Sequence, residues 1–191
     1  RHTIRDAMRI LEQSGFISVE RGGSGGPVIT DTVLNKLSSL FLDAFKWRRP
    51  SLKEFSLARN ELERVVFIHA LRNMDDSDIN ALQENIKKAK ELLKNNTVAF
   101  SENMKFHKLL AKASKNYLFV IVIEAVCTIH SDFFTKSSKE DVLSLSKRTV
   151  RAHQAVVDAL AAGLREEALV LFEKHLNEVA TTYYTSLDEE V

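Results

Sequence analysis

Three histidines and one asparagine carry the clearest candidate chemistry in this sequence. Asn103 and His107 are four residues apart in a segment of helical periodicity, so both face the same side of a helix, one turn apart. His153 and His175 each lie on a separate apolar stripe of helical period. Three imidazole nitrogens and one amide oxygen, brought together from three helices, could hold a single cation.

Each histidine could be either a metal ligand or a hydrogen-bonded residue of the core. A lone histidine on an apolar stripe is more often a hydrogen-bonded core residue than a ligand, and His69 and His130, which also lie near apolar stripes, are assigned no metal. Convergence favours a metal for the other three, because one cation would satisfy imidazoles that are costly to bury unpaired. Three nitrogens and one neutral oxygen suit Zn²⁺ or Ni²⁺ better than Mg²⁺ or Ca²⁺, and they leave coordination positions open.

Arg59 is the candidate anion-binding residue. It adjoins an expected inward stripe through Ala58, Leu62 and Val65, and a buried guanidinium needs an anionic partner. An ion pair with Glu63, four residues further along the same helix, is the alternative to a ligand role. A dication held by neutral ligands, with Arg59 beside it, would attract a small carboxylate.

Two other functions fit a three-histidine site. An open metal position is how zinc hydrolases activate water, so a helical-bundle metalloenzyme is one alternative, and a structural helical dimer with an inert metal is another. A hydrolase needs a general base, and no carboxylate is expected one turn from the histidines on the inward face. Glu102 and Glu178 fall beside the stripes. We therefore expect no catalytic activity.

The elements that must position these residues belong to one substantial core. The chain has 191 residues, of which 45% are hydrophobic, and no uncharged apolar stretch approaches the roughly 20 residues of a membrane span. The charged amino-terminal residues do not form a signal peptide, so we expect a cytoplasmic protein without a membrane partner. The single cysteine, Cys127, lies in an apolar run and is expected to be buried. The 27 basic and 26 acidic residues nearly balance and indicate no partner by themselves.

Apolar residues recur every three or four positions from residue 31 onward, which indicates helices. Ser51 and Glu54 form a capping box at one helix start, and Gly163 marks a helix end. The short connections favour an antiparallel all-α bundle. Its seven helices are predicted near residues 31–47, 51–72, 76–95, 97–114, 116–134, 140–162 and 165–187.

The first thirty residues have a different pattern: a helix ended by Gly15, a short strand, a glycine-rich turn and a second strand. In a winged helix-turn-helix, the last helix enters the major groove by its amino-terminal end and the hairpin touches the DNA backbone. Arg1, His2, Thr3 and Arg5 occupy that end of the helix and carry donors suited to guanine edges and phosphates. A solvated helix followed by a loop is the alternative.

These residues resemble the end of a GntR-superfamily DNA-binding domain. The hairpin carries Pro27 where that family usually has an aromatic residue, and the sequence begins inside the recognition helix. The resemblance implies a fragment that lacks the two preceding helices, so operator binding is expected only of the full-length protein. The matching positions are Arg1, Ile4 to Arg9, Leu11 and Glu12, Gly15 and Phe16, and Val28.

Residues 31 to 187 resemble the all-helical FCD effector domain of the FadR branch, in the seven-helix variant. The resemblance implies metal ligands at Asn103, His107, His153 and His175, with Asn103 where aspartate is more common, and an effector contact at Arg59. The matching segments are Arg59 to Glu63, Asn103 to His107 with Asn116, His153 to Val156, and His175 with Leu176.

Together the patterns and the resemblance divide the chain into a partial DNA-binding domain at 1–30 and a helical effector domain at 31–191. The expected protein is a dimeric, ligand-responsive regulator of transcription that binds operator DNA. Its expected effector is a small carboxylate, sensed through a bound divalent metal ion.

Overall fold

The computed structural model describes residues 2–20, 25–30, 32–48, 50–134 and 139–187, with side chains placed except at 133–134, 139–141 and 182–187. All seven helices expected after residue 30 are present, and the largest difference in a boundary is the start of α5, at Phe100 instead of 97. The elements in chain order are α1 (His2–Gln13), β1 (Ile17–Val19), β2 (Pro27–Ile29), α2 (Val33–Arg48), α3 (Leu52–Asn73), α4 (Asp76–Lys94), α5 (Phe100–Ala113), α6 (Tyr117–Phe134), α7 (Lys139–Ala161) and α8 (Arg165–Leu187).

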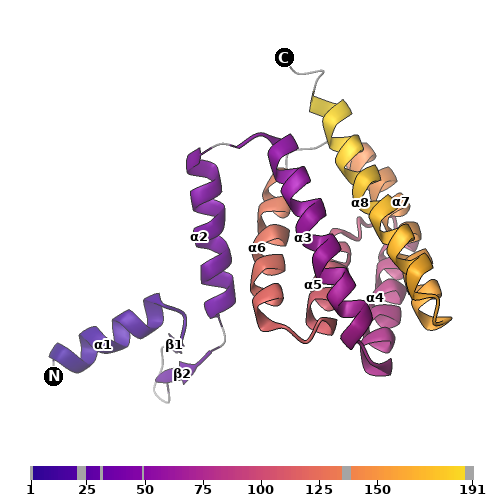
Figure 1. Ribbon diagram of the computed structural model, residues 1–191. Helices are drawn as coiled ribbons and strands as arrows, with labels where there is room; N and C mark the ends of the chain where they lie inside the picture. The colour runs from indigo at the N-terminus through magenta and orange to yellow at the C-terminus, as the bar shows by residue number, and fades with distance from the viewer. Residues whose placement is uncertain (1, 21–24, 31, 49, 135–138, 188–191) are drawn as a thin grey trace.

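The amino-terminal helix and hairpin project from the bundle, and α2 connects them to it (Figure 1). Strands β1 and β2 pair antiparallel, with Ile17 opposite Ile29. The expected order of one helix followed by two strands at the amino-terminal end is therefore confirmed. The glycine-rich tip of the hairpin, at residues 21–24, lies outside the described residues, as does Arg1.

The junction between α1 and α2 depends on Gly15. Its φ of +84° is a left-handed conformation that glycine adopts without strain, and it ends α1. The first turn of α2 contacts this end of α1: Thr32 Oγ1 donates to the carbonyl of Gly15 at 2.8 Å, and Lys36 donates to the carbonyls of Glu12 and Gln13. The first turn of α2 is thus bonded directly to the carboxyl-terminal end of α1.

Helices α3 to α8 form the bundle, and α2 packs along its side (Figure 1). Consecutive helices pack together in the pairs α4 with α5, α5 with α6, and α7 with α8, while α3 packs on α5 and α8. Helix α2 packs chiefly along α6, which is distant in sequence, because its half-buried Leu42 and Phe45 join a cluster with Val126 and Ile129 of α6. The capping box at the start of α3 is present, with Ser51 N 2.7 Å from Glu54 Oε2.

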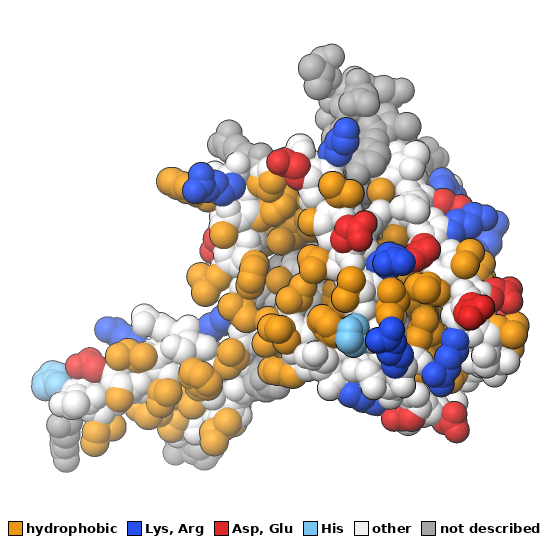
Figure 2. All heavy atoms as spheres, in the orientation of Figure 1, with side chains coloured by type: hydrophobic (Ala, Val, Ile, Leu, Met, Phe, Trp, Pro, Cys, Tyr) orange, Lys and Arg blue, Asp and Glu red, His pale blue; other side chains and the backbone are white. Residues whose placement is uncertain are grey.

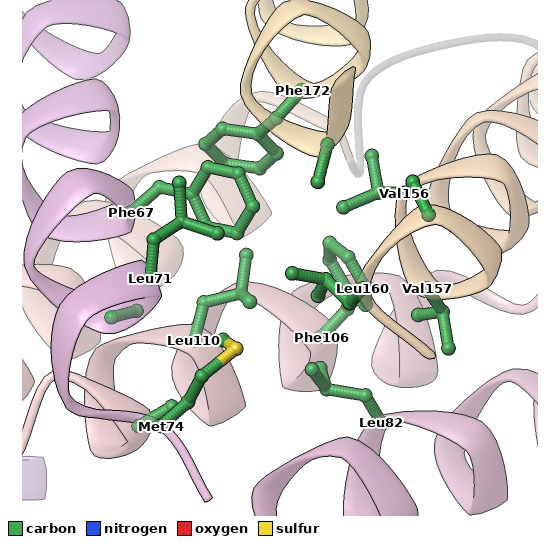
Figure 3. Close-up of a cluster of buried hydrophobic side chains, with 14 of the residues drawn as sticks. Phe67, Leu71, Met74, Leu82, Phe106, Leu110, Val156, Val157, Leu160 and Phe172 are labelled. Atoms are coloured by element: carbon green, nitrogen blue, oxygen red, sulfur yellow. The ribbon is translucent and has the colours of Figure 1, made fainter. Parts of the chain in front are cut away.

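The main core lies between α3, α4, α5, α7 and α8 (Figure 3). Phe67 of α3 packs on Phe172 of α8 with ring centroids 4.4 Å apart, and Phe106 of α5 fills the centre. Cys127 is buried, and burial raises the pKa of its thiol to about 12, which is consistent with a role in packing. Among the described residues, no helix has the length and apolar character to cross a bilayer.

The inward face of α3 differs from the expected stripe. Ala58 is exposed, and Leu62 and Val65 are 41% and 43% exposed, whereas the charged residues Arg59 and Glu63 are buried. Phe55, at the start of the expected stripe, is buried, but the inward face then continues through Arg59 and Glu63 to Val66 and Phe67, so the expectation was wrong for Ala58, Leu62 and Val65. Hydrophobic side chains gather on the surface over α2, α3 and α6 (Figure 2).

Candidate metal centre

The four expected ligands converge in the interior of the bundle. Asn103 and His107 come from α5, His153 from α7 and His175 from α8, and all four side chains are at most 5% exposed. One ring nitrogen from each of the three histidines lies within 4.8 Å of the other two, and His153 Nε2 is 3.0 Å from His175 Nε2. A tetrahedral Zn²⁺ site with Zn–N bonds of about 2.0–2.1 Å separates its ligands by about 3.3 Å. Small side-chain rotations would bring the three nitrogens to that spacing.

The packing around these histidines follows from the apolar stripes on which they lie. The ring of His153 stacks on Phe106, with centroids 3.8 Å apart, and Phe172 lies one turn before His175 on α8. The ring centroids of His107 are 5.1 Å from those of His153 and 5.6 Å from those of His175. Close aromatic packing restricts the rotamers of the ligands, which favours a preformed site.

Glu63 adjoins the candidate site, although the sequence indicated it only as an alternative partner of Arg59. Its carboxylate is buried, with Oε1 2.7 Å from Arg59 Nε and Oε2 2.6 Å from His107 Nδ1. Burial by itself would raise the pKa of Glu63, but the charges and hydrogen bonds of Arg59 and His107 outweigh it and hold the pKa below its ordinary value. Glu63 is therefore ionised, and its Oε2 faces His107 Nδ1.

This contact determines which nitrogen of His107 faces the other histidines. A hydrogen on Nδ1 directed at Glu63 would leave the lone pair of Nε2 for a metal, an arrangement common among metal-ligating histidines. Arg59 Nη2 lies 3.5 Å from the same Nε2. The Arg59 guanidinium thus lies beside the histidine nitrogen that would bind the metal. The spacing of four between Arg59 and Glu63 was the available sequence signal for this network.

The protonation states of the other histidines suit metal binding. Burial, followed by the neighbouring charges, lowers the pKa of both His153 and His175 well below the ordinary value. Both imidazoles are therefore neutral near pH 7, which is the form that binds metals. Repulsion between neighbouring imidazolium groups acts in the same direction.

Asn103 supplies the oxygen of the donor set. Its Nδ2 lies 3.4 Å from Ser146 Oγ, whereas its Oδ1 is buried and has no hydrogen-bond partner among the described residues. A buried carbonyl oxygen without a partner costs about 1–3 kcal/mol. A cation at this position would remove that cost, so the residues present fit a metal of the Zn²⁺ or Ni²⁺ type.

A small cavity adjoins the site. It is lined by residues that include Arg59, Asn103, His107 and His175. The volume within which the centre of a water molecule could lie is about 20 Å³. That space is enough for one ordered water. His130 of α6 lines the same cavity and was assigned no role from the sequence.

The buried carboxylate of Glu63 bears on the hydrolase alternative, which rested partly on the expected absence of such a group. Glu63 contacts His107 from α3, a different helix, so it is not one of the carboxylates that the sequence expectation considered. Its lowered pKa and its two partners, Arg59 and His107, make it a poor acceptor for the proton of an attacking water. Glu63 instead has the contacts of a residue that orients a metal ligand.

The candidate DNA-contacting residues lie at the start of α1. His2, Thr3 and Arg5 are exposed there, while Arg1 is outside the described residues. His2, Thr3 and Arg5 lie in a different element from the helices that carry the histidine cluster, and α2 and the hairpin separate the two regions along the chain.

Comparisons with known proteins agree with this arrangement. The family profile of the FCD domain matches residues 54–178. The chain is 23% identical over 186 residues to the HTH-type transcriptional repressor NanR of Enterobacter sp. (strain 638), which covers 96% of this chain and 71% of that repressor. It is 22% identical over 194 residues to the HTH-type transcriptional regulator LutR of Bacillus subtilis (strain 168), covering 100% and 88% of the two chains.

Among solved structures, Streptococcus agalactiae GntR aligns with 95% of this chain and 81% of its own, with a TM-score of 0.73 and 17% identity. That likeness shows that the helical bundle preceded by a hairpin is a known fold. The profile match covers most of the bundle, including all four candidate metal ligands. The chain belongs to the FCD domain family and, within it, to the GntR-type transcriptional regulators rather than to a family of enzymes.

Proposed function

We propose that this regulator senses a small carboxylate metabolite through one divalent transition-metal ion, Zn²⁺ or Ni²⁺, held by His107, His153 and His175. Asn103 is a weaker fourth ligand. The observation that carries the proposal is the grouping of three histidine nitrogens within 4.8 Å of one another, beside a buried arginine. When bound, the ion supplies Lewis-acid positions on which a carboxylate can replace water.

The charges around the cavity favour an anion. Arg59 and Glu63 compensate each other, and His153, His175 and the Asn103 amide bring no negative charge. A dication bound there would remain uncompensated in a low-dielectric interior. A carboxylate would supply the missing negative charge, and Arg59 Nη2, 3.5 Å from His107 Nε2, is close enough to hold it.

Effector binding would act on the arrangement of the helices. Arg59 lies on α3 and the ligands lie on α5, α7 and α8, so one bound carboxylate would join four helices. A ligand that binds one arrangement of these helices more tightly shifts the population toward it. Because α2 packs along α6 and is bonded to the end of α1, such a shift would move the recognition helix.

Residues 1–30 are proposed to contact operator DNA, with Arg1, His2, Thr3 and Arg5 reaching bases or phosphates. The domain boundary falls before α2, so residues 31–191 form the effector domain. We propose that the protein acts as a homodimer on a palindromic operator, since two recognition helices read two half-sites. The exposed apolar side chains on α3, Leu57, Leu62 and Val65, support a dimer interface.

A mobility-shift assay tests the function with the intact protein, which includes the complete winged helix. Acetate, malonate and citrate are each added to metal-loaded protein, to chelator-treated protein and to the Arg59→Met variant. We expect a carboxylate to change operator affinity only in the metal-loaded wild type. Arg64→Met is the matched control, because Arg64 lies on the same helix but pairs with Glu173 at the surface.

Arg59→Met also leaves Glu63 buried without its cation, so thermal melting must show that the variant is folded. Arg59→Lys keeps the charge and is expected to retain part of the response. A carboxylate response that survives both chelation and Arg59→Met would contradict the proposal. Tight, specific operator binding by residues 1–191 alone would contradict the assignment of residues 1–30 as an incomplete DNA-binding domain.

A further inference from the structure

His130 is a buried polar residue of the cavity that the candidate metal centre does not use. It lies on α6, is 5% exposed, and lines the cavity together with Arg59, Asn103, His107 and His175. Its ring stacks on Phe100, with centroids 5.9 Å apart and an angle of 4° between the planes, and lies 6.5 Å from the ring of Phe55. Two aromatic neighbours therefore fix the orientation of the imidazole at the cavity wall.

The charge state of His130 determines what it can recognise. Burial, with the positive charge of Arg59 next in importance, lowers its pKa well below the ordinary value. A neutral imidazole has one hydrogen-bond donor and one acceptor. A hydroxyl group has the same combination, whereas a carboxylate only accepts and brings a charge that the neutral ring does not compensate.

We infer that His130 is a specificity-determining residue of the effector cavity, which binds a neutral hydroxyl group on the carbon chain of a short monocarboxylate. This inference rests on the proposed function, in which the metal ion and Arg59 hold the carboxylate. Two further polar residues of the wall are uncharged: Ser146, whose hydroxyl accepts from the backbone N–H of Ala99 at 3.1 Å, and the half-buried Thr149.

The size of the cavity limits the ligand. About 20 Å³ accommodates one water molecule, so a ligand of even three carbons requires lining side chains to move outward. Phe100, Leu145 and Thr149 are the half-buried members of the lining, whereas Asn103, His107 and His130 are buried. The half-buried residues are the ones free to move toward solvent. A long or branched acid would demand a larger rearrangement, which favours a chain of three or four carbons.

Isothermal titration with a matched set of three-carbon acids tests the inference. Propionate, 3-hydroxypropionate and malonate are titrated into Zn²⁺-loaded protein, and the affinity for 3-hydroxypropionate relative to propionate is the readout. Loss of a buried neutral hydrogen bond weakens binding by about two- to tenfold. We expect the wild type to prefer 3-hydroxypropionate by about fivefold, and His130→Phe, which keeps the aromatic stacking, to reduce the ratio to about one.

Two further variants control for packing. His130→Gln keeps a donor and an acceptor, so it should retain a preference for 3-hydroxypropionate. His69→Phe makes the same change at a half-buried histidine that packs on Phe119 with centroids 5.0 Å apart, and it should leave the ratio unchanged.

The possible failures are distinguishable. If wild-type protein binds propionate and malonate but His130→Phe keeps the wild-type ratio, the role of His130 is overturned while carboxylate sensing stands. A preference for malonate that depends on His130 would also overturn it, since the site would then recognise a second charge. If no carboxylate binds metal-loaded wild type, the proposed function fails, and the inference with it.

Discussion

The substitution Glu63→Gln tests the buried polar network of Arg59, Glu63 and His107 at its central residue. Glu63 is 3% exposed and joins Arg59 Nε to His107 Nδ1, at 2.7 and 2.6 Å. The amide keeps the shape of the side chain but removes its charge. It also offers one oxygen acceptor where the carboxylate offers two, so one of the two contacts is lost.

The expected magnitude follows from burial. An exposed helical ion pair contributes about 0.2–0.5 kcal/mol, but removing one partner of a buried pair typically costs about 3–5 kcal/mol, because the remaining charge is left uncompensated. With a urea m-value of about 2 kcal/mol per molar, that loss lowers the unfolding midpoint by about 1.5–2.5 M. Metal affinity should fall by about 10–100-fold, because His107 loses its orienting carboxylate.

Urea unfolding followed by circular dichroism measures the first effect, and titration of Zn²⁺ against a chromophoric chelator measures the second. Glu61→Gln makes the same change at an exposed position on the same helix and should alter neither quantity appreciably. A loss of less than about 1 kcal/mol in Glu63→Gln, together with unchanged metal affinity, would refute the view that Glu63 supports the site.

The network should also respond to pH. The pKa of Glu63 is lowered in the folded state, so its contribution to stability is complete above the unfolded value near 4.5 and is lost as pH falls below it. Because Glu63→Gln removes this titrating group, the variant should lose less stability than the wild type between pH 5 and pH 3. An equal loss in both proteins would show that other groups cause acid unfolding.

Three other outcomes are expected. Asn103→Asp adds a negative charge to the donor set and should tighten Zn²⁺ binding; unchanged affinity in a chelator competition would argue against Asn103 as a ligand. In metal-free protein the lowered pKa values of His130, His153 and His175 should make stability fall by about 3–4 kcal/mol between pH 7 and pH 5.5, because the unfolded chain takes up protons, and a flat profile in thermal melts would contradict this. Gly15→Ala should speed amide hydrogen exchange in α1 more than Gly163→Ala speeds exchange around residue 163. Both glycines have positive φ, but only a Cβ at Gly15 would also meet neighbouring atoms, at 3.0–3.2 Å.

The sequence predicted the helices and the convergence of the three histidines because both depend on a strong helical period. His153 and His175 lie on apolar stripes whose inward direction is unambiguous, and Asn103 and His107 share a face by their spacing. Arg59 was expected inside on weaker grounds, because its neighbour Ala58 was thought to face the core. Ala58 is in fact exposed, whereas Arg59 is buried.

Glu63 could not be found in the same way, because a search for apolar periodicity assigns the inward face of α3 to Leu62 and Val65. Burial of a carboxylate there depends on Arg59 and His107, and the second of these is on another helix. The position of His130 has a similar origin: its stripe indicates burial, but only the packing of α6 against α3 and α5 brings it to the cavity. The pairing of α2 with α6 also depends on tertiary contacts that chain order does not encode.

Metal content is the most direct measurement of the central claim. Purified protein is saturated with Zn²⁺, dialysed, and analysed for metal per chain in the wild type and in His107→Ala, His153→Ala and His175→Ala, with His69→Ala as the control. We expect about one ion per chain in the wild type and in His69→Ala, and a clear loss in each of the other three, since each removes one of three nitrogen ligands. Retention of wild-type metal content by all three ligand variants would contradict the assignment of the metal centre.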